Sequence, residues 1–275
     1  MKFCINTSTL RGRGLSLPVL GSLIARAGWD AIEPWISEIE ALDATPGALD
    51  DCAKQLRDLG LVVPSAIGFS QWIVDDPSLR KLGLEDARRC MRLVHRLGGT
   101  RIAAASIGAH TPSSRVIPVE VIAERFAALA EIGRSEGIEP ELELWGFSPN
   151  LKTLDVVHKV FRAAAAQGSS MLLDIYHLYK GQSDLSLLSQ LSTGDLGVFH
   201  VNDYPKIAPD RIADKDRVYP LDGICPAKSI VSTLRGIGFN GYISLELFNP
   251  IYDQQPIELV IRRGLEKTQK LAQLA

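Results

Sequence analysis

The sequence lacks the features that mark several common classes of protein. Its 275 residues contain four cysteines, which lie far apart and form no CxxC pair, so neither a disulfide framework nor a structural zinc site is expected. No run approaches about 18 consecutive apolar residues, and the apolar part of the N-terminal MKFCINTSTLRGRG is too short for a signal peptide. These absences predict a cytoplasmic protein with no membrane partner.

Strong positive charge and a glycine-rich phosphate loop are also missing. The formal net charge is −2 and lysine and arginine form no run, which argues against a nucleic-acid partner. The first expected strand is followed by INTSTLRGRG and not by a GxGxxG turn, which disfavours a dinucleotide-binding open sheet. Hydrophobic residues make up 46% and charged residues 23% of the chain, so a well-filled soluble core is expected.

Short β-type runs alternate with longer segments in which apolar residues recur at helical spacing. The expected strands cover residues 2–6, 30–33, 61–66, 100–105, 140–144, 170–174, 197–201 and 241–247. This alternation predicts an α/β protein with parallel βαβ units that close into a (β/α)8 TIM barrel. An open doubly wound sheet is the alternative. No linker or low-complexity tract interrupts the pattern, so we expect residues 1–275 to form a single domain.

Polar residues stand at the carboxyl ends of several expected strands, where the reactive groups of such barrels lie. They are Glu33, Glu143, Asp174, His200 and Glu246. The last four come from four consecutive strands. Carboxylate oxygens and an imidazole nitrogen suit a divalent ion such as Mn, Zn, Co or Mg. We therefore predict that Glu143, Asp174, His200 and Glu246 bind one divalent metal ion.

Each of these residues alone has a simpler interpretation. An acidic residue at a strand end is commonly a helix N-cap or a solvated loop residue, and a single histidine such as His200 is commonly a core residue with its hydrogen bonds satisfied. The succession of four strand ends favours the metal site. Glu33 could bind a substrate hydroxyl or pair with a basic neighbour. Glu141 shares a strand face with Glu143, which indicates a salt-bridged interior group or a different strand register.

Five segments of the second half carry a resemblance to a known family: LELWG, LLDIYH, FHVND, DRVYPLDG and ISLELF, with INTSTL and GWDAIEPW in the first half. The chain resembles the sugar isomerase/epimerase family with a xylose-isomerase-like TIM barrel. That family includes inosose isomerase, ketose 3-epimerase and hydroxypyruvate isomerase, and the series LELWG, DIYH, FHVND and LELF is most similar to the inosose isomerase branch. The resemblance implies a sugar, keto-sugar or inosose substrate and, commonly, a homodimer.

The resemblance also implies a role for individual residues. The matching positions make Glu143, Asp174, His200 and Glu246 the metal ligands and place His177 and Arg217 beside substrate oxygens. Many family members have a proline directly after the first of these ligands, whereas Leu144-Trp145 follows here, which puts Trp145 near the pocket mouth. The aromatic residues expected near the rim, with ordinary core packing as the alternative, are Trp35, Phe69, Trp72, Trp145 and Phe248.

The expected chemistry begins with a weakly acidic carbon. Moving a carbonyl along a polyol, or inverting the centre beside it, requires removal of a proton alpha to that carbonyl. A divalent ion bound to the carbonyl and the neighbouring hydroxyl stabilises the enediolate that forms, and a carboxylate within reach acts as the base. We hypothesise that Glu143 and Glu246 are the catalytic pair on opposite sides of the substrate, one removing a proton and the other returning it.

Three other functions compete with this one. An apurinic-site endonuclease shares the barrel but needs a three-zinc cluster with several histidines. Of the five histidines here, His95 and His158 fall in helical patterns, so too few remain at strand ends for such a cluster. An inosose dehydratase-type lyase could use the same metal site, since it begins with the same proton abstraction. A barrel that only binds sugar does not need the paired carboxylates of Glu143 and Glu246.

Overall fold

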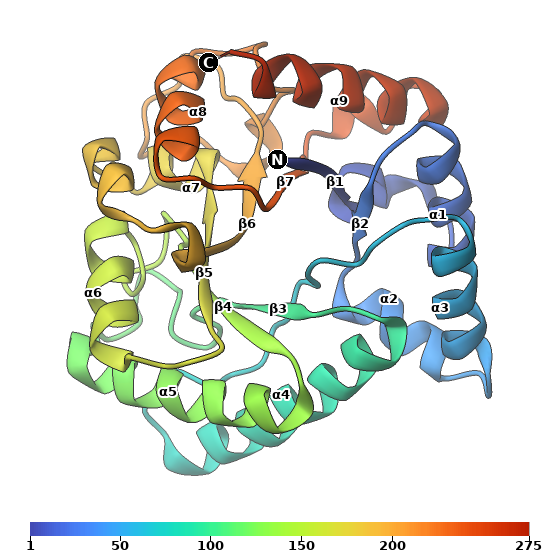
Figure 1. The fold of residues 1–275 in the computed structure, drawn as a ribbon. Coiled ribbons are helices and arrows are strands. Elements are labelled where there is room, and N and C mark those ends of the chain that lie inside the picture. The colour runs from blue at the N-terminus through green and yellow to red at the C-terminus, as the bar shows by residue number, and fades with distance from the viewer. Residues whose placement is uncertain (275) are drawn as a thin grey trace.

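The alternation of strands and helices produces a curled parallel sheet with helices outside it, which the computed structural model describes for residues 1–274 (Figure 1). The sheet order is β2-β1-β7-β6-β5-β4-β3. Neighbouring strands are parallel throughout. The strand bounds are β1 Lys2–Asn6, β2 Ala31–Glu33, β3 Arg101–Ala104, β4 Glu139–Glu143, β5 Ser170–Asp174, β6 Leu196–Val201 and β7 Tyr242–Leu245.

The gap between β2 and β3 is filled by the segment 62–67. It forms isolated parallel bridges from Val62 to Ala31 and from Ala66 to Ile102. The strand expected at 61–66 therefore lies in the expected place but is not a regular strand. Pro64 explains part of this, because proline has no N–H to donate to a ladder. The segment completes the ring, and the predicted (β/α)8 barrel is confirmed.

Helices pack around the outside of the ring (Figure 1). Their bounds are α1 Leu17–Arg26, α2 Ile36–Asp43, α3 Ala48–Asp58, α4 Pro77–Leu97, α5 Val119–Glu136, α6 Leu154–Ala164, α7 Ile175–Lys180, α8 Ala227–Gly236 and α9 Ile257–Ala272. The longest, α4, buries Ala87, Met91 and Val94 on one face and ends at Gly98, whose φ of +91° favours glycine. None of the helices within residues 1–274 is long and apolar enough to cross a membrane.

The core has two parts of unequal size. A large apolar cluster fills the space between the strands and the helices, whereas a small one, built around Ile67, Ala103, Leu172 and Val198, lies inside the barrel. Glu141 is also inside, where its carboxylate accepts hydrogen bonds from Ser65 Oγ at 2.5 Å and from the backbone N–H of Val198 at 2.7 Å. Glu141 is therefore a barrel-interior group, one of the two alternatives expected, but its carboxylate is held by these hydrogen bonds and not by the expected salt bridge.

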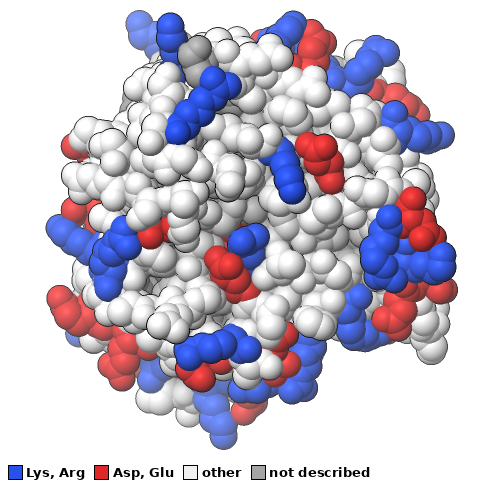
Figure 2. Space-filling model, viewed as in Figure 1, with Lys and Arg blue, Asp and Glu red and all other residues white. Residues whose placement is uncertain are grey.

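The connections after the strands position the side chains discussed below. Helix α7 follows β5 directly, so Asp174 both ends the strand and caps the helix by accepting the backbone N–H of His177 at 3.0 Å. A long connection, residues 202–226, follows β6 and is tied back by an antiparallel bridge between Asp203 and Val218. On the face in Figure 2, acidic and basic side chains are interspersed, with no broad patch of either sign.

Candidate active site

Three of the predicted metal ligands converge at the carboxyl ends of adjacent strands. Asp174 of β5 and His200 of β6 are register partners, and Glu246 follows β7, the next strand in the sheet. Each of the three offers one ligand atom, and these atoms lie within 4.8 Å of one another. His200 Nδ1 lies 3.3 Å from Glu246 Oε2 and 3.7 Å from Asp174 Oδ2. The strand ends therefore form a compact, buried set of nitrogen and oxygen donors.

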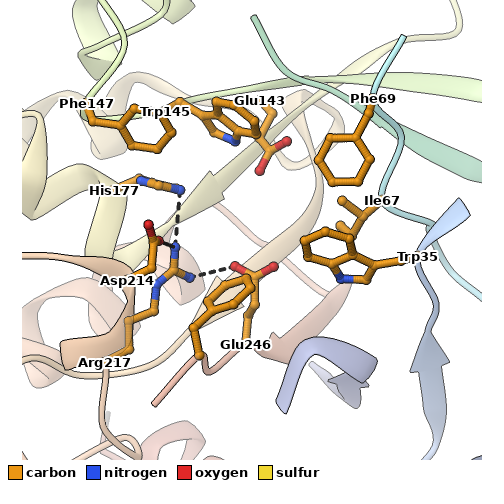
Figure 3. A pocket seen from close by; sticks show the side chains of 11 residues that line it. Trp35, Ile67, Phe69, Glu143, Trp145, Phe147, His177, Asp214, Arg217 and Glu246 are labelled. Atoms are coloured by element: carbon orange, nitrogen blue, oxygen red, sulfur yellow. Dashed lines mark hydrogen bonds and ion pairs between the residues drawn. The ribbon is translucent and has the colours of Figure 1, made fainter. Parts of the chain in front are cut away.

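Glu143, the fourth predicted ligand, lies outside this group of three but faces the same pocket. It ends β4, and Figure 3 shows its carboxylate across the pocket from that of Glu246. Its side chain is buried, and Oε2 has no hydrogen-bond partner among the described residues. Burial raises the pKa of Glu143 to about 8.

Arg217 is the buried cation of the site. Its Nη1 donates to Glu246 Oε2 at 2.6 Å and to Asp174 Oδ2 at 3.0 Å, while Nη2 donates to Asp214 Oδ1 at 2.6 Å. Nη2 also lies 3.2 Å from His177 Nε2. Arginine is only a donor, so this nitrogen of His177 is the acceptor. Burial first, and then the nearby Arg217 charge, lower the pKa of His177 to about 4.

The charges of the other two central groups are set by their neighbours. Burial alone would lower the pKa of His200, but the carboxylates of Glu33 and Glu246 outweigh it and raise that pKa well above its ordinary value. Burial opposes ionisation of Glu246 too, and here the positive charges of His200 and Arg217 outweigh it, so its pKa is lowered.

The pocket is a cavity of about 210 Å³ with largely aromatic walls (Figure 3). Trp145 packs against Phe147, with ring centroids 5.1 Å apart, and Trp35 packs against Phe69 at 4.9 Å. The residues that line it are Trp35, Ile67, Phe69, Glu143, Trp145, Phe147, His177, Asp214, Arg217, Glu246 and Phe248. Of the aromatic residues expected near the rim, Trp72 is the exception: it is buried in the core and packs against Phe126.

Among the predicted substrate contacts, His177, Arg217 and Trp145 therefore line the pocket, whereas Glu33 does not. Glu33 is fully buried at the end of β2, and its Oε2 lies 2.9 Å from His200 Nε2. Their roles toward a substrate stay predictions.

The fold brings to the site several residues that were not predicted from the sequence. Asn6 donates from Nδ2 to Glu33 and Glu246, and Asn202 donates from Nδ2 to both carboxylate oxygens of Asp174. Asn6 ends β1 and Asn202 directly follows β6, so the rule that selected the acidic strand-end residues would have found them too. Phe147 and Asp214 lie outside the strands, and no spacing in the sequence marks them.

The residues present fit a divalent metal ion. Among the described residues, His200 Nδ1 and Glu143 Oε2 are buried atoms without a hydrogen-bond partner, and both side chains stand at the carboxyl ends of the strands. Buried polar atoms are ordinarily hydrogen-bonded, so unpartnered ones indicate a missing partner. Two or three carboxylates with one imidazole form a donor set that divalent ions accept.

Comparison with known proteins places the chain in a family. A family model described as "Xylose isomerase-like TIM barrel" matches residues 22–271. The chain belongs to that family. This confirms the resemblance drawn from the LELWG, DIYH, FHVND and LELF segments.

Individual relatives are distant but match nearly the whole of this chain. The inosose isomerase of Bacillus velezensis is 24% identical, with 98% of this chain and 96% of the relative covered. The crystal structure of the IOLI protein with a bound zinc atom superimposes with a TM-score of 0.89 at 22% identity, covering 99% of this chain and 98% of that one. The 3-dehydroshikimate dehydratase of Pseudomonas putida is 21% identical over 96% of this chain but 41% of its own length.

These comparisons confirm the expected class, an enzyme of the sugar isomerase and epimerase family. Metal identity, reaction and substrate stay predictions.

Proposed function

We propose that this chain is a divalent-metal-dependent isomerase or epimerase of a small sugar, keto-sugar or inosose. One observation carries the proposal: two buried carboxylates, Glu143 and Glu246, face each other across a single pocket, and Glu246 is also one of the three clustered donors, with Asp174 and His200. A reaction that removes a proton from carbon and returns one needs such opposed groups. The similarity to an inosose isomerase supports the same reaction type.

Asp174, His200, Glu246 and Glu143 would hold the ion. When bound, it supplies Lewis acidity that stabilises negative charge developing on substrate oxygens. Similarity to a structure that contains zinc supports such an ion.

The chain's own residues perform the remaining tasks. Glu143 and Glu246 accept and donate the protons at carbon. Arg217, fixed by Asp214 and Glu246, and His177, whose Nδ1 has no partner among the described residues, hold substrate oxygens from one side. The aromatic walls exclude water around the reacting atoms, which strengthens these electrostatic interactions.

Pocket size supports a small ligand. The cavity of about 210 Å³ lies below the range of about 300–1,000 Å³ common for drug-sized ligands. A single unphosphorylated sugar or cyclitol is the substrate class we propose. Carbohydrate-like rings present apolar C–H faces that aromatic side chains such as Trp145 and Phe147 can cover.

The test is a substrate panel on purified protein supplied with Mn²⁺, Zn²⁺, Co²⁺ or Mg²⁺. Ketoses and inososes are incubated in D₂O, and the product is examined for deuterium at the carbon alpha to the carbonyl. A product whose mass equals that of the substrate, apart from incorporated deuterium, supports an isomerase or epimerase. Absence of both exchange and conversion across the panel would reject the proposal.

A lyase is the second candidate, because one relative is a 3-dehydroshikimate dehydratase. It would use the same donors and the same first proton transfer, and would then expel a hydroxyl group. Product mass separates the two candidates directly, since a lyase product has lost one water.

A further inference from the structure

Glu33 occupies an unusual place for a carboxylate. It is fully buried at the end of β2, and it does not line the pocket. Its Oε2 accepts hydrogen bonds from Ser244 Oγ at 2.7 Å and from Asn6 Nδ2 at 3.0 Å, and it lies 2.9 Å from His200 Nε2. One carboxylate oxygen therefore gathers three polar groups from three different strands, β1, β6 and β7.

This arrangement determines which nitrogen of His200 faces the other predicted metal ligands. A carboxylate oxygen that accepts from Ser244 and Asn6 is an acceptor toward His200 too, so Nε2 carries the hydrogen. Nδ1 is then the nitrogen that faces the carboxylates of Asp174 and Glu246, and it would give up its proton when an ion binds there. It is buried, has no hydrogen-bond partner among the described residues, and lies 3.3 Å from Glu246 Oε2 and 3.7 Å from Asp174 Oδ2.

A flip of the imidazole ring about its Cβ–Cγ bond would exchange Nδ1 with Cδ2 and Nε2 with Cε1. It would turn Nδ1 away from Asp174 and Glu246 and would move Nε2 out of its place beside Glu33. Glu33 is itself held by Ser244 and Asn6, so it cannot follow the ring without losing those two hydrogen bonds. The carboxylate of Glu33 thus selects one orientation of His200.

We propose that Glu33 is a positioning residue that fixes His200 so that Nδ1 is presented to the divalent ion. Ligating histidines in proteins commonly donate their other ring N–H to a carboxylate, which sets the ring orientation and raises the basicity of the ligand. Of the two roles that the sequence leaves open for Glu33, this is the pairing with a basic neighbour. The inference rests on the metal site of the proposed function.

The experiment compares metal affinity in Glu33→Ala, Glu33→Gln and unchanged full-length protein. The Kd for Zn²⁺ is measured by competition with a chromophoric chelator, and the visible absorption spectrum of the Co²⁺-loaded protein reports the ligand geometry. Glu33→Ala is expected to bind Zn²⁺ about 10- to 100-fold more weakly. Glu33→Gln is expected to lose less, because its amide oxygen still accepts from Nε2 but lacks the negative charge.

Glu141→Gln is the matched control. Glu141 is an equally buried carboxylate inside the barrel, but its partners are Ser65 and Val198 and none of the four metal ligands. This variant is expected to lower Tm while leaving the Kd for Zn²⁺ and the Co²⁺ spectrum unchanged. Ser244→Ala removes one restraint on Glu33 and is expected to weaken Zn²⁺ binding a few-fold.

The outcomes separate this inference from the proposed function. Tight Zn²⁺ binding by the unchanged protein, with an equal Kd and the same Co²⁺ spectrum in Glu33→Ala, overturns the positioning role and leaves the proposed function standing. If Glu33→Ala does not fold, Glu33→Gln is compared with Glu141→Gln instead. An equal Kd for Zn²⁺ and the same Co²⁺ spectrum in these two variants then overturn the positioning role. Failure of the unchanged protein to bind Zn²⁺ or Co²⁺ overturns the proposed function, and this inference with it.

Discussion

Two glutamates on opposite sides of the pocket, Glu246 and Glu143, have different electrostatic surroundings. On the β7 side, Glu246 bonds to Arg217 at 2.6 Å and lies 3.3 Å from His200, and these positive neighbours lower its pKa. On the β4 side, Glu143 has an oxygen without a hydrogen-bond partner among the described residues, and burial raises its pKa to about 8.

The difference shows how one rim can supply two carboxylates with separate tasks. Environments that push the pKa values of two carboxyl groups apart commonly mark an acid and a base. Glu246 is a charged group that contacts Arg217 and His200, whereas Glu143 ends β4 and forms no ion pair with another described residue. The predictions below test this asymmetry, from the largest expected effect to the smallest.

Glu246→Gln should abolish turnover. The change removes a proton-transfer group and a metal ligand, and it leaves Arg217 with a neutral partner. We expect kcat/KM to fall by at least about 10³-fold, within the range that a general base contributes, while the circular dichroism spectrum stays that of the folded barrel. Glu266→Gln, at an exposed carboxylate of α9 paired with Lys270, is the control. Full activity in Glu246→Gln would remove Glu246 from the mechanism.

Arg217→Met should destabilise the metal-free protein. Asp174 and Glu246 would lose the buried cation between them, and removal of one partner of a buried ion pair costs about 3–5 kcal/mol. Urea unfolding in the presence of EDTA measures this effect. Arg263→Met, at the surface beside Asp222, should cost less than about 1 kcal/mol. Equal effects of the two variants would contradict the pairing described for the Glu246 side.

Glu143→Gln should reduce activity without a comparable loss of stability. Its carboxylate forms no ion pair with another described residue, so the change to an amide leaves no buried cation without its partner. We expect kcat/KM to fall about 10²-fold, the lower end for one proton-transfer group, with Tm lowered less than in Arg217→Met. A loss of stability as large as that of Arg217→Met, with activity retained, would show that Glu143 is a structural residue.

Trp145→Leu should weaken substrate binding more than chemistry. Trp145 lines the pocket beside Phe147 and has His110 packed edge-on against its ring, and loss of an aromatic contact is worth about 0.5–1.5 kcal/mol. KM should therefore rise several-fold while kcat changes little. A fall in kcat with unchanged KM would place Trp145 among the residues that act on the transition state.

Part of the site could be predicted from the sequence, whereas the different environments of Glu143 and Glu246 could not. The strand ends that carry Glu143, Asp174, His200 and Glu246 could be located because, at each of them, a short β-type run ends at a polar residue. The convergence of the last three follows from strand adjacency, which the barrel imposes.

The rest depends on tertiary contacts that leave no periodic signal. Asp214 reaches Arg217 from within the long connection after β6, and Phe147 reaches the pocket from the residues after β4. Glu33 looked like a rim residue because it ends a strand, but its side chain is fully buried against His200 and does not line the pocket. The segment 61–66 looked like a regular strand because its apolar residues favour β-structure, although Pro64 has no N–H to donate to a strand ladder.

A crystal structure of the protein grown with Mn²⁺, with anomalous scattering recorded, tests the central claim most directly. The account predicts one Mn²⁺ at the pocket end of the barrel, with His200 Nδ1 and oxygens of Glu143, Asp174 and Glu246 each about 2.0–2.2 Å from it. It would be contradicted by an ion bound elsewhere, or by these four side chains remaining apart with Arg217 still between Asp174 and Glu246.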